Sequence, residues 1–150
     1  MPLTMRWGGL GARNQWGATA ADRVDWVNDT IKIALITNAV APNQDTHDYW
    51  NDLSANEIAA GSGYTAGGAT LASKTLTYDA ATNEVRLDCA DPSWPFTASK
   101  TFRYAVVYKD TGSAATSSIL GTGDFGADET TSNTFTITVD ATGLLKAVAA

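Results

Sequence analysis

The chain has few of the residues that most often carry covalent or metal chemistry. Its 150 residues include one cysteine and one histidine. A single cysteine cannot form an intrachain disulfide, and the place of Cys89 at the end of an alternating run indicates a buried, inert thiol. Any Ser-His-Asp or Cys-His arrangement would need His47, which lies in a polar run with no serine in a nucleophile-elbow context. We therefore expect a protein that is not an enzyme and binds no cofactor.

Positive charge and long apolar runs are also scarce. Ten basic residues against sixteen acidic ones leave a net charge of −6. This balance argues against a nucleic-acid partner and against adhesion to anionic membranes. No apolar run approaches the roughly 20 residues that span a bilayer, and the N-terminus lacks the apolar region of a signal peptide. We expect a soluble protein that is made in a reducing cytosol.

What the chain does have is alternation of apolar and polar side chains, strongest from Thr101 to Gly112. Successive side chains of a strand point to opposite faces. The segment should therefore be a central strand that ends in Asp-Thr-Gly turn chemistry. We expect one face of this strand to hold Phe102, Tyr104, Val106 and Tyr108, and the other to hold Arg103, Ala105, Val107 and Lys109.

Further alternating runs predict a mainly β protein, an antiparallel β-sandwich or partly closed barrel. One short helical insertion is expected at residues 46–53, followed by a capping box in Ser54–Glu57. Gly61–Gly68 and Gly121–Thr131 are expected to be loops. The main strands are expected at Asp29–Thr37, Leu71–Tyr78, Glu84–Cys89 and Asn133–Asp140, with Ile33, Leu35, Tyr104, Val106, Phe135, Ile137 and Val139 in one core.

Residues 1–28 differ from the β domain at residues 29–150 and are expected to form an extended N-terminal arm. They contain three tryptophans and several glycines without a sustained period, and their net charge is about +1, against about −7 for the remainder. Tryptophan and arginine are enriched at interface hot spots. The arm is therefore expected to bind a partner through Arg6, Trp7, Arg13 and Trp16. An equally favoured alternative is that Trp7, Trp16 and Trp26 fold back onto the domain's own core.

Three segments contain residue types that can bind ligands. The polar run at residues 45–48 has the ligand types of a metal site, but acids at the start of a helical turn explain it better. The acidic segment at residues 124–129 lacks the ligand spacing of a calcium loop. Gly61–Gly68 has neither the Gly-Lys-Ser/Thr ending of a P-loop nor the dinucleotide-binding spacing. We expect no metal site, and glycines that serve backbone positions with positive φ.

Four segments follow one another in an order that resembles a known group of proteins. They are Asp29–Ile36, then Ile58 with Gly63–Gly68, then Leu71–Thr75, then Ala105–Gly112. This succession is similar to that of small structural proteins of tailed bacteriophages, over roughly residues 29–140. The resemblance implies a virion component of the head decoration type, without a catalytic motif. It further implies synthesis in the bacterial host cytoplasm and a place on the capsid surface, with the major capsid protein and neighbouring copies as partners.

Three functions of different classes remain open from the sequence. A capsid decoration, or cement, protein would bind the assembled head shell and stabilise it. A phage tail or receptor-binding module would bind a host carbohydrate through exposed aromatic residues such as Trp50 or Trp94. A small hydrolase would need a carboxylate pair in a cleft. The number of copies in purified particles separates the first two.

Overall fold

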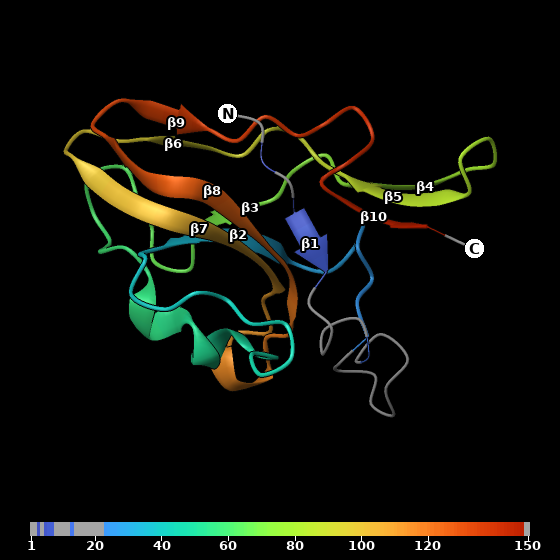
Figure 1. Cartoon of the computed structure of the whole chain (residues 1–150), viewed down its shortest axis with the longest axis horizontal. Coiled ribbons are helices and arrows are strands. Elements are labelled where there is room, and N and C mark those ends of the chain that lie inside the picture. The colour runs from blue at the N-terminus through green and yellow to red at the C-terminus, as the bar shows by residue number, and fades with distance from the viewer. Residues whose placement is uncertain (1–2, 4, 8–12, 14–22, 149–150) are drawn as a thin grey trace.

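The computed structural model describes residues 3, 5–7, 13 and 23–148 (Figure 1). The expected fold class is confirmed, because the chain is mainly antiparallel β and its sheets do not close into a barrel. The strands are β1 (Met5–Trp7), β2 (Ile31–Ile36), β3 (Ala69–Thr70), β4 (Thr75–Asp79), β5 (Glu84–Asp88), β6 (Ser93–Pro95), β7 (Lys100–Lys109), β8 (Ile119–Thr131), β9 (Thr134–Thr136) and β10 (Leu145–Val148). Short 3-10 turns occur at η1 (Trp50–Asp52), η2 (Ser54–Asn56) and η3 (Ala114–Thr116).

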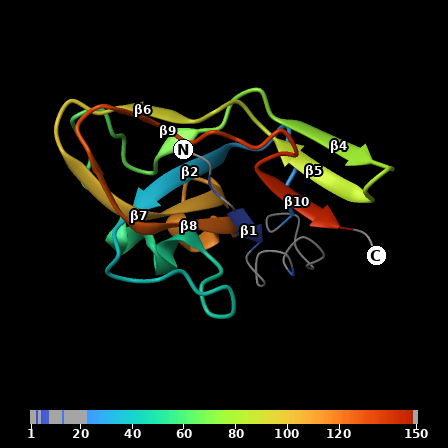
Figure 2. The same ribbon diagram turned by 45° about the horizontal axis from the view of Figure 1, so that its top comes forward.

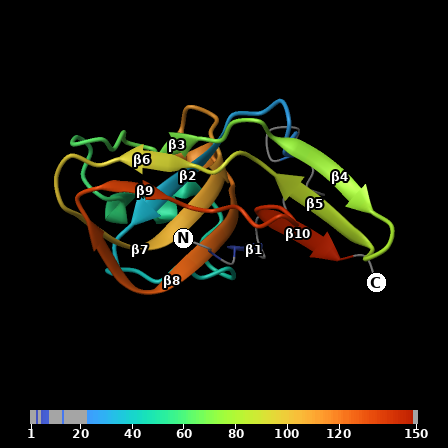
Figure 3. The same ribbon diagram turned by 90° about the horizontal axis from the view of Figure 1, so that it is seen from above.

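The strands form three sheets. A five-stranded sheet has the order β1-β8-β7-β2-β3, a three-stranded sheet the order β10-β5-β4, and β6 pairs with β9. The β6–β9 pair lies over one face of the five-stranded sheet, and the 3-10 turns lie on the other side (Figure 1). The three-stranded sheet extends away from this body, with the β4–β5 hairpin at its far end (Figures 2 and 3). The result is a sandwich-like body with an overhanging sheet.

β2 and β7 form the centre of the five-stranded sheet because each is apolar on both faces. Every residue of β2 except Lys32 is buried. Ile33 pairs with Val107, and the next pair is Ala34 with Val106. Adjacent pairs point to opposite faces of a sheet, so apolar side chains emerge from both faces and both need a cover.

Two hydrophobic clusters provide that cover, and the expectation of a single core is therefore wrong. The first lies between the five-stranded sheet and β6, β9 and the base of the overhanging sheet. Of the residues expected to share one core, it contains Ile33, Leu35, Phe135, Ile137 and, at its margin, Val139. The second cluster contains Val106, with Tyr104 at its margin. Trp50 of η1 stacks there on Tyr108, with ring centroids 4.7 Å apart.

A bulge in β8 changes the expected faces of β7. The four residues 125–128 of β8 lie opposite the single residue Arg103 of β7. Phe102 consequently belongs to the first cluster, whereas Tyr104 belongs to the second. The expected single aromatic face of β7 is thus broken at Arg103. Phe125, from the bulge itself, packs edge-on against Phe102 with ring centroids 5.6 Å apart.

The segment Gly121–Thr131, expected to be an acidic loop, forms most of β8. Its backbone pairs with β7 on one side and with β1 on the other. Glycine within a strand generally weakens it, so the glycine content of this segment predicted a loop. A Cβ atom on Gly121 would lie 2.7 Å from the backbone oxygen of Arg6. The close approach of β1, rather than a turn, requires glycine at this position.

The glycine-rich loop Gly61–Gly68 has positive φ at each of its glycines, as expected. The Glu57 carboxylate binds this loop: its Oε1 accepts hydrogen bonds from the Tyr64 hydroxyl and from the Gly67 N–H, each at 2.7 Å. The buried Tyr64 hydroxyl also accepts a hydrogen bond from the Leu35 N–H at 3.0 Å. The loop is therefore connected to the centre of the main sheet through one carboxylate and one phenol.

The helical insertion is present as the successive turns η1 and η2, but its capping differs from the expectation. Glu57 is occupied by the glycine-rich loop, so the capping box predicted for Ser54–Glu57 is wrong. Asp52 caps the insertion instead, because its Oδ2 accepts the N–H groups of Asp48 and Tyr49 at 3.0 and 3.2 Å. A four-residue motif does not distinguish these two uses of an acidic side chain.

Candidate functional site

β1 is the edge strand of the five-stranded sheet, and it belongs to the segment expected to bind a partner. It pairs antiparallel with residues 121–123 of β8. Leu3 and Met5 pack against the first hydrophobic cluster, whereas Arg6 is exposed. A Cβ on Gly123 would lie 2.6 Å from the Met5 sulfur. The two glycines of this part of β8 therefore make room for β1.

An open groove of about 690 Å³ lies beside β1 and β10, here termed the β1–β10 groove. Apolar side chains from both ends of the chain form part of its wall. Polar groups from the turn before β10, and from β10 itself, form the remainder. The lining residues are Leu3, Met5, Thr138, Asp140, Thr142, Gly143, Leu144 and Lys146.

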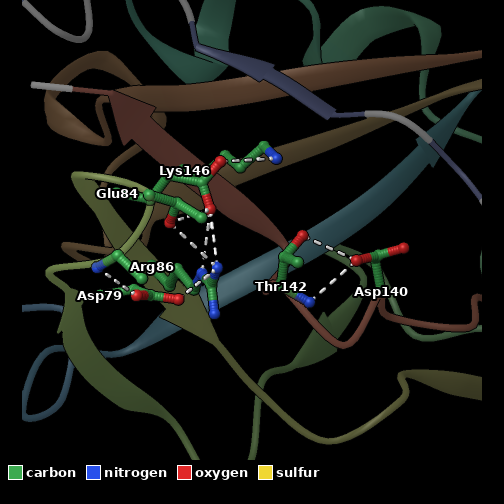
Figure 4. Close-up of polar contacts among 8 residues, drawn as sticks. Asp79, Glu84, Arg86, Asp140, Thr142 and Lys146 are labelled. Carbon is green, nitrogen blue, oxygen red and sulfur yellow. Dashed lines mark hydrogen bonds and ion pairs between the residues drawn. The ribbon is translucent and has the colours of Figure 1, made fainter. Parts of the chain in front are cut away.

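Asp140 starts the turn that leads into β10. Its Oδ1 accepts hydrogen bonds from the Thr142 hydroxyl at 2.7 Å and from the Thr142 N–H at 2.8 Å (Figure 4). The bond from the Thr142 side chain is the main reason that the pKa of Asp140 lies below its ordinary value. Asp140 therefore presents a negative charge to the groove at neutral pH.

Lys146 connects the groove to a row of ion pairs on the polar face of the overhanging sheet (Figure 4). Its Nζ lies 3.0 Å from Oε1 of Glu84. On the other side of Glu84, Nη2 of Arg86 lies 2.8 Å from Oε2 of Glu84 and 2.7 Å from Oδ2 of Asp79. The bond from Arg86, followed by the bond from Lys146, lowers the pKa of Glu84, and Glu84 in turn raises the pKa of Arg86. Glu84 and Arg86 are therefore both ionised at neutral pH.

The carboxylates of this groove and of the adjoining row of ion pairs suit recognition better than proton transfer. A general acid or base works best when its pKa lies near the working pH. The pKa values of Asp140 and Glu84 are instead moved further below neutrality by hydrogen-bond donors. Fixed charges beside apolar side chains are a common arrangement at the core and rim of a binding surface.

The opposite face of β1 borders a second groove of about 400 Å³, here termed the Arg6 groove. Its lining residues are Arg6, Ala41, Pro42, Tyr104, Thr122, Gly123 and Asp124. Asp124 of this lining is paired with Arg103, whose Nε lies 2.7 Å from Oδ1 of Asp124, and this bond lowers the pKa of Asp124. The Arg103 guanidinium also lies 5.5 Å from the centroid of the Tyr104 ring. β1 thus has a groove on each of its two faces.

The four predicted partner-binding residues lie in different situations. Arg6 lines the Arg6 groove, and the backbone of its neighbour Trp7 pairs with Gly121. The Trp7 side chain and the whole of Trp16 lie outside the described residues. Arg13 is exposed, and its Nη2 lies 3.9 Å from Asp48 of the same chain. The structure therefore places Arg6 and Trp7 together on β1, with Arg13 beside an acid of its own domain.

Trp26 belongs to the core. Of the two alternatives left open by the sequence, this residue follows the one in which the tryptophan folds back onto the domain. Its side chain is 2% exposed within the first cluster, and its Nε1 donates a hydrogen bond to the Asp88 carbonyl at 3.1 Å. Nearby, Nζ of Lys109 donates to the Arg23 carbonyl at 2.7 Å. Residues 23–28 and β1, both assigned to the arm, thus lie against the β domain.

Two other sets of candidate residues have structural roles. Trp50 and Trp94, considered as exposed platforms for a sugar, are both buried. Nδ1 of His47 accepts the Asn43 N–H at 3.0 Å and so supports a turn. In the part of the chain that the structure describes, no group of three His, Cys, Asp or Glu residues could hold a metal ion.

Sequence patterns alone did not single out the charged residues of the β1–β10 groove and of the ion-pair row beside it. Two signals were available. Asp140-Ala-Thr142-Gly143 is a turn sequence in which an aspartate can bind the amide two residues later. Glu84 and Arg86 occupy the same parity of β5, which predicts a charged sheet face. What the sequence could not indicate is that β10 brings Lys146 to that face.

No family model, curated protein or solved structure matches the chain. Among the described residues, no helix is long and apolar enough to cross a membrane.

Proposed function

We propose that the protein is a head decoration, or cement, protein of tailed bacteriophages that binds the assembled shell, stabilises it and catalyses no reaction. Its partners are the major capsid protein and neighbouring copies of itself on the capsid surface. The observation that carries the proposal is β1, an edge strand with a groove on each face. An extended segment of a partner can pair with such an edge while the grooves receive its side chains.

Charge supports a protein partner at this edge. The domain from residue 29 onward is acidic, whereas the first 28 residues carry a small positive charge. Arg6 is the cationic residue of the Arg6 groove, and arginine contributes strongly to interfaces because its planar group makes paired hydrogen bonds to carboxylates. We propose that Arg6 and Trp7 bind an acidic and partly apolar surface of the shell, assisted by Arg13 and Trp16.

The receptor-binding alternative has less support. It relied on aromatic side chains that could stack on a sugar, and the two proposed for that role are buried in the two hydrophobic clusters. Charged side chains in the β1–β10 groove are compatible with a carbohydrate, but they provide no aromatic platform. A decoration role is therefore the function that this surface supports best.

The test is binding of the purified full-length chain to head shells assembled without it. Co-sedimentation at increasing concentration measures both affinity and the number of copies at saturation. Arg6→Glu should weaken binding by at least about tenfold, the effect of losing roughly 1.4 kcal/mol. Arg23→Glu is the matched control, because Arg23 is also exposed but lies outside both grooves.

Decoration requires saturation at a fixed ratio to the major shell protein, together with shells that resist heating better when the protein is bound. A handful of copies in purified particles would move the protein to the tail. Equal binding by Arg6→Glu, Arg23→Glu and the unchanged chain would remove β1 from the attachment site.

A further inference from the structure

β4 is an exposed edge strand without the usual protection of an edge. It pairs only with β5 in the described part of the chain, and its residues Thr75–Tyr78 are all exposed. Natural edge strands are commonly protected by shortness, lysine, proline or a bulge. The edge strands β1 and β3 have three and two residues, whereas β4 has five and reads Thr-Leu-Thr-Tyr-Asp, in regular register with β5.

The overhanging sheet has one apolar face, and β4 carries its most exposed part. Leu76 and Tyr78 are opposite Leu87 and Val85 on β5, so all four share a face. At the base of the sheet, Leu87 is buried in the first cluster. Leu76 and Tyr78, by contrast, are 53% and 58% exposed. Large apolar side chains exposed next to an open strand edge indicate a binding surface.

The sequence of β4 is complementary to itself in one antiparallel register. If Thr77 lies opposite Thr77 of a second copy, Leu76 lies opposite Tyr78 in both directions. Aromatic and aliphatic residues in directly opposite positions stabilise an antiparallel pair. The same register places the apolar faces of both copies on one side, because opposite residues share a face of the sheet. A shift by one residue would set the apolar face of one copy against the polar face of the other.

Charge permits the approach of a second copy at this edge, although the chain as a whole has a net charge of −6. Asp79, the only charged residue of β4, is paired with Arg86 at 2.7 Å. On the same face, Glu84 is paired with Lys146 at 3.0 Å. The two acids and two bases at the β4 end of the polar face therefore balance one another, and Asp88, opposite Thr75 at the base of the sheet, is the remaining acid of β5 on this face.

We infer that the occupant of the β4 edge is a second copy of this chain. The two copies pair β4 to β4 about a two-fold axis at Thr77, and the two overhanging sheets join into one continuous six-stranded sheet, twice the three strands of each copy. Leu76 and Tyr78 of each copy become partly covered by those of the other. This inference does not depend on the proposed attachment to a shell, which involves β1 in a different sheet.

The first test measures the mass of the full-length chain in solution by sedimentation equilibrium over a wide concentration range. The unchanged chain should reach a dimer. Thr77→Lys places two lysines opposite each other at the two-fold axis and should raise the dimer dissociation constant by at least about tenfold. Thr134→Lys is the control, because Thr134 is an exposed threonine of a strand in another sheet.

The second test measures the gain of a covalent bond. It therefore does not depend on whether a variant with an added charge still folds. Thr77→Cys should form an intermolecular disulfide under mild oxidation, since directly opposite residues bring their Cβ atoms within reach of such a bond. Thr134→Cys should not, and Cys89 is buried and does not compete. A monomer at all concentrations, a dimer unaffected by Thr77→Lys, or equal cross-linking of the two cysteine variants would each overturn the inference.

Discussion

Replacing Glu57 with alanine is expected to lower the free energy of unfolding by about 2–4 kcal/mol. The carboxylate accepts hydrogen bonds from the Tyr64 hydroxyl and the Gly67 N–H. A hydrogen bond to a charged group contributes roughly 1.5–3 kcal/mol, and a buried donor left unpaired costs roughly 1–3 kcal/mol. Tyr64 is 3% exposed, so its hydroxyl would lose its acceptor without access to water. The partial exposure of Glu57 itself keeps the sum toward the middle of these ranges.

Urea denaturation at neutral pH provides the measurement, and Glu57→Gln provides the matched variant. Glutamine keeps a carbonyl oxygen that can accept both bonds, so it should lower the free energy of unfolding by less than about half as much. Tyr64→Phe removes the other partner. The double variant Glu57→Ala with Tyr64→Phe should lose less free energy of unfolding than the sum of the losses in the two single variants, because both changes remove the same hydrogen bond.

The same carboxylate predicts a particular dependence on pH. Burial raises the pKa of Glu57 above its ordinary value, although the bonds from Tyr64 and Gly67 act in the opposite direction. The folded state therefore binds this proton more tightly than the unfolded state. The part of the stability that comes from this tighter proton binding is fully present below the ordinary glutamate pKa and is lost as the pH rises through the raised folded pKa, whereas the hydrogen bonds to the ionised carboxylate remain at neutral pH. Glu57→Gln lacks this loss, so its stability relative to the unchanged chain should improve from about pH 4 to pH 7.

Two results would refute this account of the glycine-rich loop. One is a loss of less than about 0.5 kcal/mol in Glu57→Ala, the usual range of a surface substitution without a specific role. The other is a stability difference between Glu57→Gln and the unchanged chain that is independent of pH. Either result would mean that the loop is held by the close packing of its glycines and not by the carboxylate.

Three further outcomes are expected. Trp26→Ala should lower the free energy of unfolding by about 3–5 kcal/mol in thermal or urea unfolding, because it empties a buried site and breaks the bond to Asp88, whereas an arm residue would show almost no change. Gly121→Ala should displace β1 and speed amide hydrogen exchange at Arg6 with little change in the far-ultraviolet spectrum; unchanged exchange would contradict the close approach. Cys89 should resist alkylation at pH about 8 until the protein unfolds, since burial raises its pKa to about 12, and rapid labelling of the native chain would contradict this.

The fold class could be predicted because the strongest signals are local. β2 and β7 alternate with the period of a strand, and their residues fit a sheet covered on both faces. β4 and β5 were likewise visible, as the strands expected at Leu71–Tyr78 and Glu84–Cys89. In each case the property that determines the structure lies within a few residues of sequence.

The errors arise where a distant segment decides the structure. Gly121 looks like a loop residue until β1 is placed beside it, since the close backbone approach comes from a strand more than a hundred residues earlier. The parity of β7 was misread at Arg103 because the extra residues that break it belong to β8. Glu57 has the spacing of a capping residue, but its partner is a tyrosine beyond the end of the motif. Such pairings follow from topology, which local patterns do not contain.

The candidate site shows the same division. Arg6 and Trp7 were selected by residue type, and β1 does place them at a sheet edge. The charged row through Lys146, Glu84 and Arg86 needed the pairing of β10 with β5, which no local pattern indicates. Residue type thus identified candidates for the interface, whereas the neighbours that shape the grooves required the assembled sheets.

β1 and β4, each at the edge of its sheet in the described part of the chain, also have a joint consequence. β1 belongs to the five-stranded sheet and β4 to the overhanging sheet, so one can pair with a partner while the other pairs with a second copy. A dimer joined at β4 carries two β1 edges at a fixed spacing, and a regular shell offers repeated sites. Once one β1 edge of the dimer is bound, the other β1 edge binds at a high effective concentration. Two weak contacts thereby give tight attachment. Thr77→Lys should therefore weaken binding to shells even though Thr77 lies far from β1, while leaving the affinity for an isolated shell subunit unchanged. If the affinities for shells and for the isolated subunit fall equally, β4 contacts the shell directly, and dimerisation at β4 does not strengthen attachment through β1.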